Sequence, residues 1–117
     1  MIVDFVDSKV LLQASIDEAL YEKLVAQITK DFGLAAIAVE LPLQVSPKNL
    51  KTILHQKIYQ LMLDRFTDYL NVLYIVDVSE KSIKEIQAID PIEIADQVSF
   101  LILKREYQKV WFRNKYS

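Results

Sequence analysis

Residues 46–76 read SPKNLKTILHQKIYQLMLDRFTDYLNVLYIV, and this stretch decides the fold class. Ser46 is a preferred N-cap and Pro47 suits the first helical turn, so we expect a helix to begin here. No helix breaker follows, and one continuous helix to Val76 is the favoured interpretation. Residues 69–78 are apolar nearly all round, so a buried strand stays open as the alternative there. The helical stripe consists of Leu50, Leu54, Ile58, Leu61, Met62, Phe66, Tyr69, Leu73 and Val76.

A second long helix is expected from Pro91 to about Asn114. Asp90 precedes the proline as a cap, and Glu93 follows three residues after Asp90, the spacing of a capping box. The apolar surface of this helix shifts around its axis, so it could contact both its own core and a second chain. That surface consists of Ile94, Val98, Leu101, Ile102, Leu103, Tyr107, Val110 and Trp111.

The N-terminal part is expected to combine one helix with extended segments. Ser15 and Glu18 fit a capping box, and Gly33 is placed to end the helix that follows in a left-handed conformation. Residues 1–14 are expected to form one or two strands or an extended arm, and residues 34–45 an extended segment or edge strand. A turn over residues 77–82 and a short helix over residues 83–88 complete the chain. The fold class is therefore a mainly α helical hairpin or three-helix bundle, with two long helices and a small N-terminal strand or extended element.

Composition limits both architecture and chemistry. A chain of 117 residues is expected to form a single domain over residues 1–117. The absence of cysteine excludes disulfides, thiolate nucleophiles and cysteine-ligated metals. The single glycine excludes glycine-rich phosphate loops, so no cofactor and no metal is expected. No apolar run is long enough to span a membrane and no secretory signal is recognised, which predicts a cytoplasmic protein.

Catalytic candidates are few. His55 is the single histidine and would have to be the base of any nucleophilic triad, but a histidine at the surface or boundary of a helix is the simpler interpretation. Carboxylates also recur at helical spacing, where solvated faces are favoured over a metal or acid–base site. These pairs are Glu18 with Glu22, Asp64 with Asp68, and Glu93 with Asp96.

Charge is distributed unevenly along the chain. Residues 1–103 hold nine basic and fifteen acidic groups, a net charge of −6, whereas residues 104–117 hold five basic groups and one acidic group, a net charge of +4. In the second segment the basic residues Arg105, Lys109 and Arg113 recur every four positions, which places them on one ridge of a helix. We call these three residues the basic ridge.

Three interpretations of the basic ridge are open. It could complement the dipole at the end of its own helix while the aromatic residues beside it pack on the core. It could belong to a protein-binding or self-association surface, because tryptophan and arginine are enriched at interface hot spots. It could bind phosphates of nucleic acid or anionic lipid, which the overall net charge of −2 disfavours. The candidate interaction surface consists of Arg105, Lys109, Trp111, Phe112 and Arg113.

The sequence therefore predicts a non-catalytic protein-interaction or self-association module. Apolar residues, tyrosine included, make up 52% of the chain, and part of this apolar surface is expected to lie at a partner interface. We expect a homodimer with a possible further protein partner. The alternatives are a helical bundle that binds a small molecule or nucleic acid, and a small enzyme that uses His55.

Overall fold

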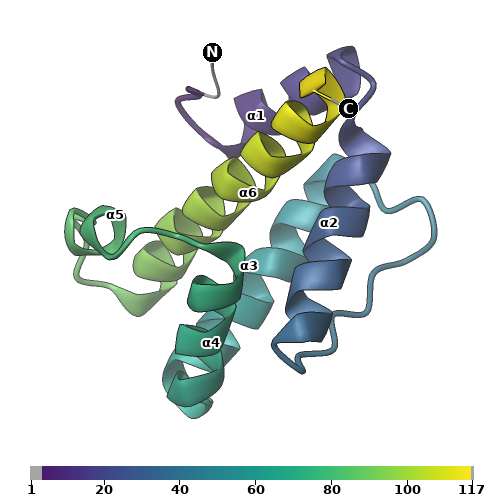
Figure 1. Ribbon diagram of the computed structural model, residues 1–117. Helices are drawn as coiled ribbons and strands as arrows, with labels where there is room; N and C mark the ends of the chain where they lie inside the picture. The colour runs from purple at the N-terminus through teal and green to yellow at the C-terminus, as the bar shows by residue number, and fades with distance from the viewer. Residues whose placement is uncertain (1–3, 117) are drawn as a thin grey trace.

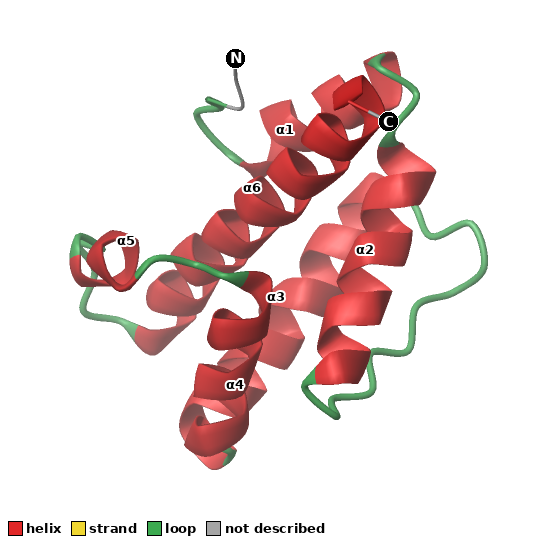
Figure 2. Ribbon diagram, in the orientation of Figure 1, coloured by secondary structure: helices red, strands yellow, loops and turns green. Residues whose placement is uncertain are grey.

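The structure is a computed structural model that describes residues 4–116. It is mainly α, as predicted, and no strand occurs within this range (Figure 2). Six helices follow one another along the described part of the chain (Figure 1). They are α1 (Ser8–Asp17), α2 (Tyr21–Leu34), α3 (Pro47–Asp64), α4 (Phe66–Val76), α5 (Glu80–Lys84) and α6 (Pro91–Tyr116).

The core is organised around α6, which contacts α1, α2, α3 and α4 (Figure 1). Buried apolar side chains repeat along α6 at helical spacing and meet buried leucine and isoleucine side chains of α2 and α3. The prediction of a helix from Pro91 is confirmed, because Asp90 Oδ1 accepts the backbone N–H of Ile92 at 2.7 Å and so caps the first turn. The buried apolar residues of α6 are Ala95, Val98, Ile102, Leu103, Tyr107 and Val110.

The expected strand within residues 1–14 is wrong from Ser8 onward, where α1 begins; residues 1–3 lie outside the described residues. Asp7 caps α1, since its Oδ1 accepts the backbone N–H of Val10 at 2.9 Å. The predicted capping box is also wrong. Ser15 lies within α1, where its hydroxyl donates to the carbonyl of Leu12 at 2.7 Å. A left-handed residue, Ala19 with φ of 58°, then separates α1 from α2.

Gly33 does not end the second helix in a left-handed conformation. It lies inside α2, and the left-handed residue after the helix is Ala36, with φ of 61°. Residues 36–46 then form a loop rather than a strand. Within this loop the carbonyl of Val45 accepts the hydroxyl of Tyr21 at 2.6 Å, which ties the loop to the start of α2.

The expected continuous helix over residues 47–76 is broken at Arg65, whose φ of −143° and ψ of 63° are not helical. A continuous helix of that length would extend about 45 Å, which exceeds the longest dimension of the molecule, 36 Å. The break allows α4 to turn back and bury Tyr69, Val72, Leu73 and Val76. Residues 69–76 are helical, so the strand alternative is wrong for them.

The last expectations concern the short connection to α6. The predicted helix over residues 83–88 lies earlier, as α5, because Ser79 is its N-cap and accepts the backbone N–H of Ser82 at 3.1 Å. No helix within residues 4–116 combines the length and the apolar character needed to cross a lipid bilayer.

Candidate functional site

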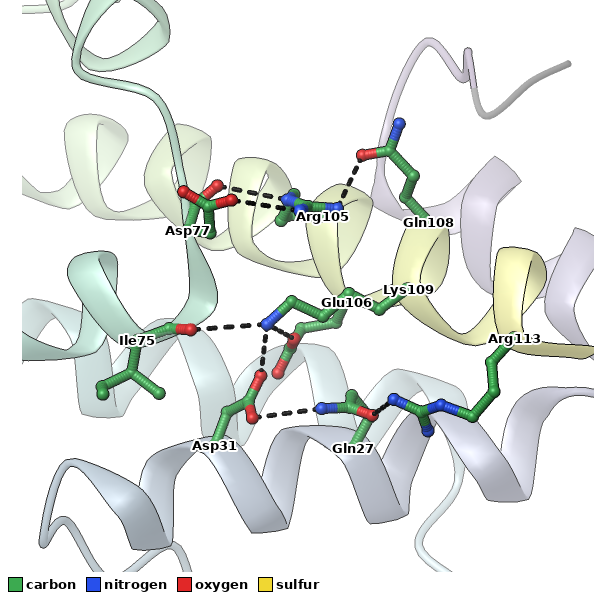
Figure 3. A network of polar contacts seen from close by, with 9 residues as sticks. All are labelled: Gln27, Asp31, Ile75, Asp77, Arg105, Glu106, Gln108, Lys109 and Arg113. Carbon is green, nitrogen blue, oxygen red and sulfur yellow. Dashed lines mark hydrogen bonds and ion pairs between the residues drawn. The ribbon is translucent and has the colours of Figure 1, made fainter.

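The basic ridge of α6 lies against α2 and the end of α4, and its side chains form hydrogen bonds with residues of both (Figure 3). Arg105 donates to the backbone carbonyl of Asp77 at 3.2 Å and to its Oδ2 at 3.1 Å. Asp77 is the left-handed residue that ends α4, with φ of 72°. Arg105 therefore closes the end of α4 by binding both the free carbonyl and the side chain of the residue found there.

Lys109 occupies the centre of a buried polar cluster. Its Nζ lies 2.7 Å from Asp31 Oδ2 on α2, 3.4 Å from Glu106 Oε1 on its own helix, and 3.4 Å from the carbonyl of Ile75 on α4. The side chains of Asp31 and Glu106 are 5% and 0% exposed. One cation therefore faces two buried carboxyl groups at the junction of α2, α4 and α6 (Figure 3).

The two carboxyl groups have opposite pKa shifts. Burial, the hydrogen bond with Asp31 and the negative charge of Asp31 raise the pKa of Glu106 to about 9, against the opposing effect of Lys109. Burial acts to raise the pKa of Asp31 as well, but hydrogen bonds from Glu106, Lys109 and Gln27 outweigh burial and lower it. At neutral pH the pair therefore consists of a protonated Glu106 and an ionised Asp31.

The proton on Glu106 also resolves its hydrogen bonding. When the group is ionised, neither oxygen has a hydrogen-bond donor among the described residues, because Lys109 reaches Oε1 only as an ion contact. A buried carboxylate without donors is costly. A proton on Glu106 turns it into a donor toward Asp31, whose oxygens are acceptors. The cluster therefore consists of the buried ion pair of Lys109 and Asp31 and the neutral carboxylic acid of Glu106.

Gln27 and Arg113 connect the buried cluster to the surface. Gln27 donates its amide to Asp31 Oδ1 at 3.1 Å, and its Oε1 accepts from Arg113 at 2.9 Å. Arg113 is exposed at the end of this chain of bonds. The basic ridge thus changes character along α6, because Lys109 is enclosed whereas Arg113 reaches solvent.

Arg113 lines a surface groove between α2 and α6 with a volume of about 360 Å³. We call it the α2–α6 groove. Lys23 and Lys30 of α2 contribute two further cationic side chains, and Lys23 donates to the side chain of Asn114 at 3.3 Å. No carboxylate belongs to the lining. The full lining is Lys23, Ala26, Gln27, Lys30, Val110, Arg113 and Asn114.

The predicted aromatic surface residues lie in different environments. Trp111 is half-buried and packs against the core. Phe112 is 39% exposed, and its ring stacks on that of Tyr116 with centroids 6.0 Å apart. Lys115 places its Nζ 5.3 Å from the centre of the Trp111 ring, a cation–π contact. The outward aromatic pair is therefore Phe112 with Tyr116, beside the exposed end of the basic ridge.

His55 is half-buried on α3, with Nε2 2.9 Å from the backbone carbonyl of Ile92. A carbonyl only accepts, so Nε2 carries the hydrogen in this contact. The histidine thereby links α3 to the first turn of α6.

Asp68, a member of one of the expected carboxylate pairs, forms an ion pair with Arg65 at 2.6 Å. Within the described range no group of three histidine, aspartate or glutamate side chains is placed to hold a metal.

Another surface hollow, about 900 Å³, lies between α2 and the loop over residues 36–46. It bears on the alternative of a small-molecule-binding bundle. Its lining is mostly apolar and open to solvent, and it includes the loop residue Leu43, which is 96% exposed. It lacks the convergent charged groups of the α2–α6 groove, which contains three cationic side chains.

Sequence reasoning missed the partners of the basic ridge on α2. Asp31 and Gln27 lie four residues apart on the apolar face of α2, and Glu106 lies between Leu103 and Val110 in the apolar register of α6. A charged residue in an apolar register signals a buried, paired group, and that signal was present in the sequence. No protein-family model, curated protein or solved structure matches this chain.

Proposed function

We propose that the chain is a non-catalytic protein-interaction module whose α2–α6 groove binds an acidic segment of a partner protein. The observation that carries the proposal is the groove lining, in which Lys23, Lys30 and Arg113 surround an apolar floor of Ala26 and Val110 without a carboxylate. Glutamate or aspartate side chains would pair with the three cations, and an apolar side chain between them would cover the floor.

The proposal uses part of the surface expected from the sequence. Arg113 provides a cation at the groove, and the exposed aromatic pair of Phe112 and Tyr116 neighbours Arg113 along α6 without lining the groove. Arg105 and Lys109 support the surface indirectly, because they hold α6 against α4 and α2. The ion pair of Lys109 with Asp31 joins α6 to α2, the two walls of the groove.

An acidic protein segment suits this surface better than nucleic acid or anionic lipid. The chain as a whole carries a net charge of −2, so a polyanion longer than the groove would meet repulsion from the acidic body. A short acidic segment would contact the cations alone. We further propose a cytoplasmic protein that self-associates as a homodimer, a proposal supported by the large apolar side chains that the fold leaves exposed, among them Phe66, Leu70 and Tyr74.

The test is fluorescence anisotropy with a labelled peptide of alternating glutamate and leucine, compared with a glutamine–leucine peptide of the same length. The variant Lys23→Glu/Lys30→Glu reverses two cations of the groove, and both side chains are exposed. We expect it to weaken binding of the acidic peptide at least about tenfold, equivalent to about 1.4 kcal/mol. The matched control is Lys9→Glu/Lys48→Glu, which makes the same charge change at two exposed residues near the first turns of α1 and α3.

Specific binding of the acidic peptide that only the groove variant loses would support the proposal. Equal loss in both double variants would overturn it, because the attraction would then follow total charge. Binding to a duplex oligonucleotide or to phosphatidylserine vesicles with higher affinity than to the acidic peptide would also overturn it, in favour of a phosphate ligand.

A further inference from the structure

One helix of the bundle exposes large apolar side chains in a regular row. Phe66, Leu70 and Tyr74 of α4 are 57%, 48% and 83% exposed. A spacing of four residues places them one turn apart on the same side of the helix. We call them the α4 stripe. The opposite side of α4 is buried against its neighbours α2, α3 and α6 (Figure 1).

Charges flank the α4 stripe only at its ends. The exposed residues beside it, Thr67 and Asn71, are polar and uncharged. Arg65 precedes the stripe with its side chain 62% exposed, and Asp77 follows it with its side chain 75% exposed. Each of these two charges also has a partner within the chain, Asp68 and Arg105 respectively, and the exposed Asp64 adjoins Arg65.

We infer that the α4 stripe is a homodimer interface in which α4 of one copy packs antiparallel on α4 of a second copy. This inference rests on the self-association part of the proposed function and is independent of the α2–α6 groove. A two-fold axis near Leu70 sets Phe66 of each copy against Tyr74 of the other. The same symmetry brings each Arg65 toward the partner's Asp77, whereas a parallel arrangement would bring like charges together.

The stripe supplies part of the area that such an interface needs. Large apolar and aromatic side chains present about 150–250 Å² each, so the exposed parts of three of them provide on the order of 300 Å² per copy. A stable interface buries about 800 Å² per partner around an apolar centre with a polar rim. The stripe supplies the apolar centre, and the side chains of Arg65, Thr67, Asn71 and Asp77 supply the rim.

The first test is the mass of the protein by size-exclusion chromatography with light scattering. We expect twice the chain mass of 13.6 kDa for the unmodified protein, little changed by salt. Leu70→Glu places two carboxylates at the axis and should give the mass of one chain with an unchanged helical circular dichroism spectrum. The matched control is Leu43→Glu, which makes the same substitution at a loop residue that is 96% exposed, and it should remain a dimer. A single-chain mass for the unmodified protein, or a dimer that survives folded Leu70→Glu, would overturn the inference.

The orientation of the two helices is tested by disulfide cross-linking, which is clean because the chain has no cysteine. Leu70→Cys alone should form a disulfide with the same residue of the second copy, since residues near a two-fold axis lie close to their equivalents. If Leu70→Glu does not fold, the cross-linking of Leu70→Cys serves as the test of the interface in its place. Phe66→Cys and Tyr74→Cys should form a mixed disulfide when combined and little disulfide when separate. Disulfides formed by each of the two variants alone would indicate parallel helices and overturn the arrangement.

Failure of the dimer and failure of the groove are distinguishable. Leu70→Glu leaves Lys23, Lys30 and Arg113 unchanged, so it should bind the acidic peptide as the unmodified protein does. Conversely, Lys23→Glu/Lys30→Glu should retain the mass of two chains.

Discussion

The ammonium group of Lys109 on α6 lies 2.7 Å from the carboxylate of Asp31 on α2, with both side chains largely withdrawn from solvent. The two residues are 78 positions apart in the sequence. A buried ion pair is strongly dependent on its second partner, because removal of one charge leaves the other desolvated and unpaired. The junction of α2 and α6 therefore rests on an interaction that tolerates little change.

Lys109→Met should destabilise the protein by about 3 kcal/mol or more, since it removes the cation but keeps most of the aliphatic stem. The carboxylate of Asp31 would then retain only Gln27 and Glu106 as hydrogen-bond partners. Urea unfolding followed by circular dichroism would measure the free energy of unfolding.

The control for that experiment is Lys30→Met, the same substitution at an exposed residue of α2. It should change the free energy of unfolding by less than about 0.5 kcal/mol. Equal effects of the two substitutions would contradict the buried ion pair.

Glu106 should make the stability of the protein depend on pH. The unfolded chain releases this proton near the ordinary value of 4.5, whereas the folded protein keeps it up to about pH 9. The folded state then binds more protons in this window, so the free energy of unfolding falls as the pH rises through it, by at most about 1.4 kcal/mol per pH unit. Asp31 acts in the opposite direction, because its pKa is lowered from 3.8, and that stability is lost only in acid.

Glu106→Gln should flatten this dependence, because glutamine has the same shape, can donate to Asp31 and does not titrate. Thermal unfolding of both proteins between about pH 5 and 8 would show it. Glu40→Gln, at an exposed loop residue, should keep the slope of the unmodified protein. A parallel pair of curves for Glu106→Gln and the unmodified protein would show that Glu106 does not hold a proton across this window.

The starts of the two longest helices, α3 and α6, were predictable because their caps are local. Ser46 and Asp90 each accept backbone hydrogens within three residues, so the signal lies within one turn of sequence. The break at Arg65 has no such signal, since neither glycine nor proline marks it. It follows from the need of α4 to bury Tyr69 and Val76 against helices that are distant in sequence. That requirement is tertiary and leaves no local trace.

The candidate site, like the fold, was predictable from the sequence only in its local features. Helical spacing was sufficient to place Arg105, Lys109 and Arg113 on one ridge of α6. Which neighbour that ridge faces depends on the packing of α2, and spacing along α6 carries no information about it. The carboxylate of Asp31 at 2.7 Å from Lys109 therefore appears only in the structure. The interaction surface itself remains a prediction, now centred on Arg113 with Lys23 and Lys30 of the α2–α6 groove.

Gly33 and Ala36 give a test of the corrected end of α2. Gly33→Ala should stabilise the protein by about 0.5–1 kcal/mol, because the residue is helical and nothing lies within 4 Å of the added Cβ. Ala36→Gly should also stabilise it, by about 1 kcal/mol, since Ala36 has φ of 61° and glycine adopts that region freely. Thermal unfolding of the two single variants would measure both effects.

The two positions serve as controls for each other. If Gly33 ended the helix in a left-handed conformation, Gly33→Ala would be destabilising and Ala36→Gly would lose stability through added chain freedom. A lowered melting temperature for Gly33→Ala would therefore restore the interpretation drawn from the sequence and contradict the bounds of α2.

Trp111 and Phe112 are adjacent in sequence, with ring centroids 5.2 Å apart, and should nevertheless separate stability from binding. Trp111 packs against the core, so Trp111→Ala should cost about 2 kcal/mol or more in the free energy of unfolding. Phe112 is 39% exposed and directly precedes Arg113 of the groove lining along α6, so Phe112→Ala should cost less than about 1 kcal/mol and weaken binding of the acidic peptide several-fold. Urea unfolding and peptide anisotropy on each variant measure the two quantities. Equal loss of stability in both variants would place Phe112 in the core, and unchanged peptide binding by Phe112→Ala would remove the aromatic pair from the proposed surface.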